Sequence, residues 1–195
     1  MPLNYSLNHR KPTAHQRLPK YLRGDDWIRD LLRRGQLAHI ASAWDDQPFV
    51  TPSTYLFDEA RHRLIFHSNI TGRVRANIEQ HTLVCVEVSE FGKVLPSNVA
   101  LEFSLQFRSA IVFGNAGLIQ DTEEKRMVMH RLIAKYFGKM EAGIDFRPAT
   151  DKELTRTSVY GLQIESWSGK ENWKERADQS DEWPALDEKW FDEYR

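Results

Sequence analysis

Short apolar runs, separated by turn-forming residues, fill most of the chain between residues 25 and 172. The most regular is residues 101–107, LEFSLQF, in which four apolar side chains alternate with three polar ones. A period of two residues puts successive side chains on opposite faces of a strand. We therefore expect a half-buried strand at 101–107, with its apolar side chains on the buried face.

Six further segments have the composition of strands, with β-branched and aromatic residues between turn formers. They are residues 37–44, 49–57, 63–68, 82–88, 109–119 and 157–165. A turn is expected at residues 45–48, DDQP, between the first two. Pro52 interrupts the segment 49–57, and because proline cannot donate a backbone hydrogen bond, it indicates an edge, a bulge or a ligand-facing position.

Three helices are expected around these strands. The first covers about residues 25–35 and begins with an acidic pair, and the second covers about residues 71–80. The third spans residues 121–137, beginning at Asp121 and ending at Gly138. Seven short strands in hairpin-like succession favour a small antiparallel barrel over a parallel sheet with crossover helices.

Composition narrows the class of protein. Apolar residues make up 41% of the 195 residues, which excludes a wholly disordered chain and suits one domain. The net charge of −1 argues against nucleic-acid or membrane binding over the whole surface. The one cysteine, Cys85, cannot form an intramolecular disulfide, and its valine neighbours indicate a core position. No apolar run could span a membrane, so a cytoplasmic protein is expected.

The two ends of the chain carry opposite charge. Residues 1–24 contain five basic residues and no acidic one, and we interpret them as a basic N-terminal arm. The segment 173–195 is acidic and contains Trp173, Trp183 and Trp190. Because such aromatic surface is stabilised by burial, this tail is expected to pack on the body or on a partner subunit. The domain between them then covers residues 25–172.

The most informative chemistry lies where the strand 63–68 meets the following helix. Ser68, Asn69 and Thr71 precede Gly72, where the helix opens. A helix N-terminus has free amide groups and a positive dipole end, so it favours anions such as phosphate. Arginines in the first turn, Arg73 and Arg75, would be unfavourable there without an anion nearby. The alternative is an ordinary helix whose arginines reach solvent.

Other candidate residues carry weaker signals. His67 could be a catalytic or ligand-facing group, or simply a packed histidine. No histidine is paired with carboxylates at metal-ligand spacing, so no metal site is expected. Trp167 and Lys170 follow the last strand and would suit a planar anionic ligand, although a surface pair is equally compatible. No phosphate loop, dinucleotide-binding glycine motif or nucleophile elbow is present.

Residues 37–172 resemble the flavin-binding split-barrel superfamily of pyridoxamine 5′-phosphate oxidase, and in particular its nitroimidazole-resistance-type nitroreductase branch. The motifs that carry this resemblance are residues 50–56 (VTPSTYL), 67–73 (HSNITGR), 109–116 (SAIVFGNA) and 168–170 (SGK), in the family's order. The fold implied is mainly β (α+β), an antiparallel split β-barrel with a few peripheral helices.

The resemblance also implies a site. FMN would lie in a cleft at the interface of a homodimer, with its phosphate held by Gly72 and Arg73. Ser68 and Asn69 would lie nearby, and Trp167 and Lys170 would close the site, in one arrangement from the other subunit. The flavin ring would lie against the segment Pro52, Ser53, Thr54 and Tyr55. One departure is Val74, where many relatives have lysine; Arg75 follows one residue later, rotated by about 100° on the helix.

The function expected from this resemblance is that of an FMN-dependent oxidoreductase. It would reduce a small planar acceptor, a nitroaromatic or a quinone, with a nicotinamide or another electron donor. The alternative is a binding protein without turnover that holds flavin or haem, in which case His62 or His67 could ligate the iron. No counterpart of the residues that bind pyridoxal phosphate in the true oxidase is found, which argues against vitamin B6 oxidation.

Overall fold

The computed structural model describes residues 19–193. Within them the strands are β1 (Leu22–Arg23), β2 (Ala38–Trp44), β3 (Gln47–Ser53), β4 (Tyr55–Asp58), β5 (Arg63–Asn69), β6 (Leu83–Leu95), β7 (Ser104–Leu118) and β8 (Thr157–Asn172). The α-helices are α1 (Asp25–Arg34), α2 (Arg73–Gln80), α3 (Thr122–Phe137), α4 (Asp151–Leu154) and α5 (Lys189–Glu193). Short 3-10 helices are η2 (Pro19–Tyr21), η3 (Glu59–Arg61) and η4 (Ala100–Glu102). Of the expected basic arm, residues 1–18 lie outside the described part of the chain.

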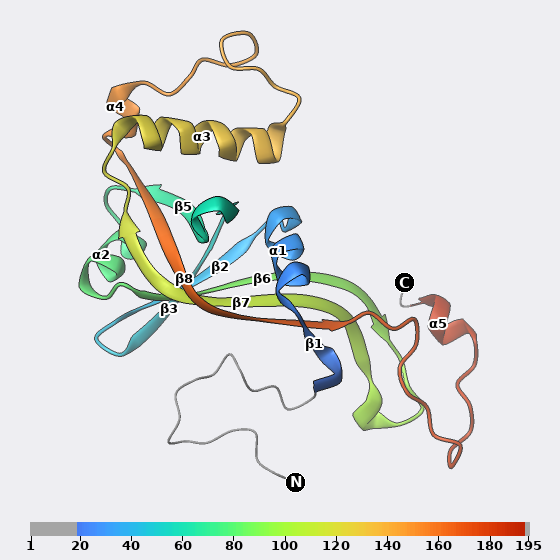
Figure 1. Ribbon diagram of the computed structural model, residues 1–195. Helices are drawn as coiled ribbons and strands as arrows, with labels where there is room; N and C mark the ends of the chain where they lie inside the picture. The colour runs from blue at the N-terminus through green and yellow to red at the C-terminus, as the bar shows by residue number, and fades with distance from the viewer. Residues whose placement is uncertain (1–18, 194–195) are drawn as a thin grey trace. The chain divides into compact units, whose positions relative to one another are not determined.

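One sheet contains all eight of these strands, in the order β3-β2-β6-β7-β8-β5-β4, with β1 beside β8 (Figure 1). The pairs β1–β8, β2–β3, β2–β6, β4–β5 and β5–β8 are antiparallel. β3 and β4 therefore end the path of the sheet. This arrangement, with few helices around it, confirms the expected antiparallel split β-barrel of the mainly β (α+β) class.

The described residues group into two units, and each is described by itself. One contains residues 32–88 and 111–167, and the other contains residues 19–31, 89–110 and 168–193. The first unit holds β2 to β5, α2, α3 and α4, and with them most of the residues expected to form the site. The second holds the β6–β7 connection and the segment that follows β8.

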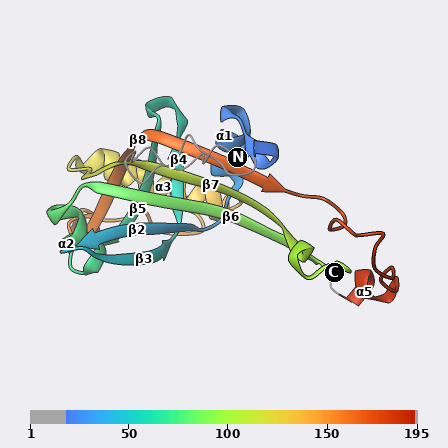
Figure 2. The same ribbon diagram turned by 90° about the horizontal axis from the view of Figure 1, so that it is seen from below.

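A tight hairpin joins β2 to β3. Asp45 and Asp46 form its two-residue turn, with φ of 44° and 63°, and Trp44 pairs with Gln47. Two positive φ values are typical of a type I′ turn, which matches the twist of paired strands. The expected turn is therefore present but shorter, because Gln47 and Pro48 already belong to β3. Figure 2 shows this hairpin close to α2, which packs against β2.

The expected strand 49–57 is two strands. β3 pairs with β2 as far as Ser53, the chain turns at Thr54, and β4 pairs with β5 from Tyr55 onward. A single strand was predicted because β-branched and aromatic residues lie on both sides of Thr54, and composition carries no information about which partner each half has. Pro52 lies at the edge of the sheet, opposite His39, as one of the three interpretations of this proline required.

The expectation for residues 101–107 is wrong at its start and inverted in its burial. η4 covers Ala100–Glu102, so the strand begins only at Ser104 and continues to Leu118 as one strand rather than two. Leu101 and Phe103 are 93% and 61% exposed, whereas Gln106 is 3% exposed. Gln106 is buried because its amide accepts from Lys93 N at 3.1 Å and donates to Lys174 O at 2.9 Å.

α3 packs on the first unit through an apolar cluster. Val128 and Leu132 of α3 are buried against residues of β4, β5 and β8, namely Leu56, Ile65 and Val159, and against Ile119. Its N-cap is confirmed, since the Asp121 carboxylate accepts from Glu124 N at 2.7 Å. No helix among residues 19–193 is long and apolar enough to cross a membrane.

A charged network accompanies this cluster. Asp58, at the end of β4, is 4% exposed, and its carboxylate accepts a hydrogen bond from Arg63 Nε at 3.1 Å. Arg61 and Arg131 each lie 3.5 Å from its carboxylate, and Arg63 also bridges to Glu124 of α3 at 2.5 Å. The β4–β5 hairpin is thereby tied to α3 by charge as well as by apolar contact.

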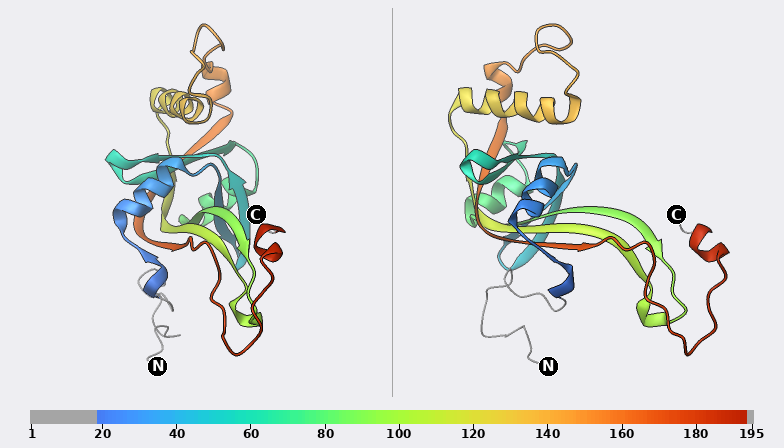
Figure 3. Two further views of the ribbon diagram at one scale, coloured as in Figure 1. Left: turned by 90° about the vertical axis from the view of Figure 1, so that its right-hand side faces the viewer. Right: turned by 45° about the vertical axis from the view of Figure 1, so that its right-hand side comes forward.

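In the second unit, the segment after β8 lies beside the β6–β7 connection, and both views of Figure 3 show the two side by side. Ser97 Oγ donates to Asp178 O at 2.7 Å, and Asn98 exchanges hydrogen bonds with Gln179 and Ser180. Arg108 lies over the Trp173 ring at 3.8 Å. Residues 173–180 thus satisfy polar groups of the β6–β7 connection.

Candidate functional site

The candidate site begins where β5 ends and α2 starts. Asn69 Oδ1 accepts from Thr71 N at 3.1 Å, and this turn leads the chain into Gly72. Gly72 has φ of 144° and ψ of 174°, a conformation that side-chain-bearing residues rarely adopt. Nothing lies within 4 Å of the position that a Cβ would take there. The backbone at Gly72 is consequently open to a close approach by a ligand.

The first turn of α2 presents free amide groups. The first amide that donates along the helix is that of Ala76, to Gly72 O at 3.1 Å. The amides of Arg73, Val74 and Arg75 therefore lie ahead of the helical hydrogen bonds, at the positive end of the helix dipole. Together with Gly72, these groups form a donor set that fits a phosphate oxygen.

The two arginines of this turn have different surroundings. Arg73 is exposed, and its guanidinium lies 4.6 Å from the centre of the Phe49 ring on β3. Arg75 is half-buried; it pairs with Glu79 at 2.5 Å and donates to Ser158 Oγ at 3.0 Å. Arg73 thus carries the cation that remains accessible to an anion, while Arg75 is held against β8.

β8 contributes two hydroxyl groups that sequence reasoning missed. Ser158 pairs with Ser68, and Tyr160 pairs with Phe66, so all four lie on one face of the sheet. Ser68 Oγ and Tyr160 OH are 3.0 Å apart, and the Tyr160 ring stacks on Phe66 at 5.1 Å. The register between strands about 90 residues apart decides this grouping, and no local pattern announces it.

The segment 52–55 lies between β3 and β4. Ser53 Oγ donates to Thr54 O at 2.9 Å, and Pro52 and Thr54 are exposed. Tyr55 is buried, donates through its hydroxyl to Leu32 O at 2.7 Å, and pairs with Phe66. The partner of Tyr55, Phe66, lies two residues before Ser68 on β5. The structure therefore brings the segment 52–55 to the same end of β5 as the Gly72 turn.

The family of the chain follows from comparison with known proteins. A family model described as pyridoxamine 5′-phosphate oxidase matches residues 25–171. The chain belongs to this family. The resemblance found in the sequence motifs is thereby confirmed. No curated protein sequence matches the chain.

Several solved structures share the fold. The flavocytochrome Anf3 from Azotobacter vinelandii is 25% identical with a TM-score of 0.76, covering 88% of this chain and 78% of that one. An FAD and haem binding protein from Mycobacterium smegmatis is 24% identical with a TM-score of 0.70, covering 82% and 76%. A candidate 5-nitroimidazole antibiotic resistance protein from Bacteroides thetaiotaomicron is 19% identical with a TM-score of 0.61, covering 77% and 90%.

In this member of the pyridoxamine 5′-phosphate oxidase family, His67 lies away from the Gly72 turn. It alternates with Ser68 and pairs with Val159, so it belongs to the face of the sheet that carries α3. Burial lowers the pKa of His67 and so favours its neutral imidazole. Its Nδ1 is buried and has no hydrogen-bond partner among residues 19–193. His67 therefore does not share a face with the hydroxyl groups of Ser68 and Tyr160.

Trp167 does not join the Gly72 turn within the chain. Trp167 lies nine residues after Ser158, roughly 30 Å along β8, and its ring contacts His62 at 4.8 Å and Phe57 at 6.3 Å. Lys170 belongs to the second unit, where its ammonium lies 6.0 Å from the Phe107 ring. Gly169 between them has a packing role, because a Cβ there would lie 2.7 Å from Ile28 Cγ1 of α1.

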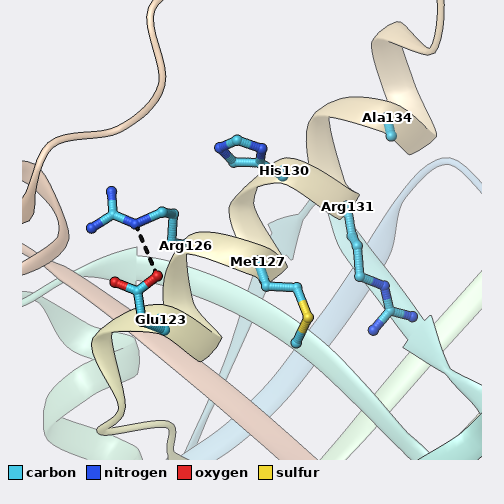
Figure 4. Close-up of a pocket in the computed structure, with 6 residues that line it drawn as sticks. All are labelled: Glu123, Arg126, Met127, His130, Arg131 and Ala134. Atoms are coloured by element: carbon cyan, nitrogen blue, oxygen red, sulfur yellow. Dashed lines mark ion pairs between the residues drawn. The ribbon is translucent and has the colours of Figure 1, made fainter. Parts of the chain in front are cut away.

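The remaining candidates, a cysteine, a metal site and a cavity, lack the features of a reactive site. The core position expected for Cys85 is only partly right, because the residue is half-buried. Burial together with the charge of Glu87 raises the pKa of its thiol, as expected for a cysteine without an activating neighbour. No cluster of metal-ligating side chains is found in the described part of the chain. A shallow cavity of about 400 Å³ lies on α3, but Figure 4 shows one of its cations, Arg126, already paired with Glu123.

Proposed function

We propose that the chain is a flavoprotein, an FMN-dependent oxidoreductase that reduces a small planar acceptor of the nitroaromatic or quinone type. The observation that carries the proposal is the open turn at Gly72, followed by the free amides of α2 and the exposed Arg73. In a chain of this family, such a donor set suits the phosphate of a flavin. A bound flavin would supply hydride transfer, which no side chain can supply.

The protein groups would bind and orient the cofactor. Gly72 would let the phosphate approach the backbone, and Arg73 would neutralise its charge. Ser68 and Asn69 would lie beside it, and Tyr160 would fix the Ser68 hydroxyl through their 3.0 Å contact. The flavin ring would lie against the backbone of the segment 52–55.

A homodimer is part of the proposal, with NAD(P)H as the electron donor. Trp167 is too far along β8 to close the Gly72 site of its own subunit, which favours its contribution, with that of Lys170, to the site of a partner. The outer face of β3 and β6 supports a partner as well, because Val50 and Leu83 expose apolar side chains there. Nucleic acid and membrane are not expected partners.

The first test is the absorption spectrum of the purified protein, followed by the mass of the released ligand. Paired flavin bands are expected, with the mass of FMN rather than FAD, although relatives of known structure bind FAD. Anaerobic NADH or NADPH should then bleach these bands, and a nitroaromatic or a quinone should restore them. A colourless protein that does not bind added FMN or FAD would contradict the proposal.

Arg73→Ala should weaken FMN binding about tenfold to a hundredfold, because a charge-assisted hydrogen bond to phosphate would be lost. Arg75→Ala should cost less, since Arg75 is engaged with Glu79 and Ser158. Both affinities can be measured by titration of the flavin-free protein, followed through flavin fluorescence. Unchanged affinity in a folded Arg73→Ala protein would rule out the phosphate assignment.

Haem binding is the second candidate function, because two relatives of similar structure are a flavocytochrome and an FAD and haem binding protein. A neutral imidazole is the form that ligates haem iron, and burial, which lowers the pKa of His67, favours that form. His62 is the other expected ligand, with its ring against Trp167. A Soret band that disappears in His67→Ala or His62→Ala would favour this function.

A further inference from the structure

The end of α3 contacts both polar backbone groups of Tyr55, its N–H and its C=O. Tyr55 N donates to Tyr136 OH at 3.1 Å. Tyr55 O accepts from Lys135 Nζ at 3.2 Å and lies 3.3 Å from Tyr136 OH, which also donates to Gln36 O at 2.8 Å. Two adjacent side chains of one helix thus satisfy both polar backbone groups of Tyr55.

These contacts satisfy backbone groups on the edge of β4 that does not pair with β5. β4 ends the path of the sheet, so alternate backbone groups of this strand have no neighbouring strand to pair with. Tyr55 is the first residue of β4, directly after Thr54. Lys135 and Tyr136 therefore fix the chain at the point where it leaves the segment 52–55.

Lys135 is an unusual choice for this position if stability alone mattered. Its ammonium is half-buried, 3.7 Å from the centre of the Tyr55 ring and 5.3 Å from that of Tyr136. Among residues 19–193 no carboxylate lies within ion-pair distance of it, and burial lowers its pKa to about 8. A methionine could cover the same ring without the cost of burying a charge. A half-buried charge that packing does not require points to a role beyond packing.

We propose that Lys135 and Tyr136 are positioning residues for the flavin. They hold the backbone of Ser53–Tyr55 in the conformation that receives the flavin ring, and Lys135 places a positive charge beside this segment. This inference rests on the proposed flavin function. It assigns a role in cofactor binding to two residues of α3 that lie outside the sequence motifs of the site.

The test compares Lys135→Met and Tyr136→Phe with Lys139→Met, a change of an exposed lysine that directly follows the C-cap of this helix. Flavin affinity should fall about tenfold in each of the first two proteins and stay unchanged in the third. Lys135→Arg, which keeps the charge and a donor, should recover most of the affinity. In the flavin-free proteins, hydrogen exchange of the Tyr55 amide should be about tenfold faster in Tyr136→Phe than in the wild type.

A pH profile separates positioning by charge from a purely structural role. The groups facing the ammonium are the ring and carbonyl of Tyr55 on β4 and Tyr136 on α3. Flavin affinity of the wild type should fall as the pH rises through about 8, where Lys135 loses its proton, and that of Lys135→Met should not.

The possible failures are distinguishable. If the wild type binds flavin, and Lys135→Met and Tyr136→Phe bind it within twofold of the wild type, the inference is overturned while the proposed function stands. If the wild type binds no flavin, the proposed function is overturned and the positioning role with it.

Discussion

Asp58→Asn is expected to lower the free energy of unfolding by about 3 kcal/mol, because the buried ion pair between Asp58 and Arg63 is lost. The carboxylate is 4% exposed and faces three guanidinium groups, of Arg61, Arg63 and Arg131. Asparagine keeps the volume of the side chain and removes only its charge. Urea denaturation at neutral pH measures the loss.

The same carboxylate predicts a pH dependence. Burial raises the pKa of Asp58, but the hydrogen bond from Arg63 and the charges of Arg131, Arg63 and Arg61 outweigh it, so the pKa lies below its usual range. The native protein therefore binds fewer protons than the unfolded chain as the pH drops toward that pKa. Stability present at neutral pH is lost progressively in acid, and Asp58→Asn should lose less.

Glu59→Gln is the control for both measurements. Glu59 is the next residue and also pairs with an arginine, Arg33, but both side chains are exposed. Exposed pairs contribute less than about 1 kcal/mol. Equal losses in Asp58→Asn and Glu59→Gln would contradict the role given to the buried network.

Gly114→Ala is expected to destabilise the protein by about 3 kcal/mol, at the upper end for an overpacked site. A Cβ at Gly114 of β7 would lie 1.9 Å from the backbone oxygen of Gln163 on β8, and backbone cannot rotate away as a side chain can. The strands would have to separate locally. The thermal midpoint and the urea midpoint should both fall.

Gly117→Ala is the matched control, since Gly117 lies on the same strand and has nothing within 4 Å of its Cβ position. Its stability should stay near that of the wild type or rise slightly, because alanine restricts the unfolded chain. A Gly114→Ala protein as stable as Gly117→Ala would show that the close approach of β7 and β8 is relieved at little cost.

The sequence predicted correctly those features of the fold that depend on a few neighbouring residues. Asp121 and Gly138 mark α3 correctly because a cap depends on its own few residues. The turn at Gly72 was identified for the same reason. Long-range pairing decided what was missed: Gln106 is buried by contacts with Lys93 and Lys174, and nothing in its own segment indicates them.

The candidate site also has one part that neighbouring residues determine and another that long-range pairing determines. The turn around Gly72 is continuous in sequence, so its residues were found together. Ser158 and Tyr160 join it only through the register of β5 and β8. Lys135 has the sequence context of an ordinary surface lysine, and only the packing of α3 on β4 gives it a role.

The two prolines of β3 have a consequence for the protein in a crowded cell. Pro48 and Pro52 lie opposite Ala43 and His39 of β2, and Val50 lies between the two prolines. Because these three residues alternate along β3, their backbone N and C=O groups all point away from β2, toward the open edge of the sheet. A strand from another molecule that tried to extend the sheet at this edge would find two of three consecutive donors missing. The exposed end of the sheet is thereby a poor template for aggregation, even though Val50 leaves apolar surface beside it.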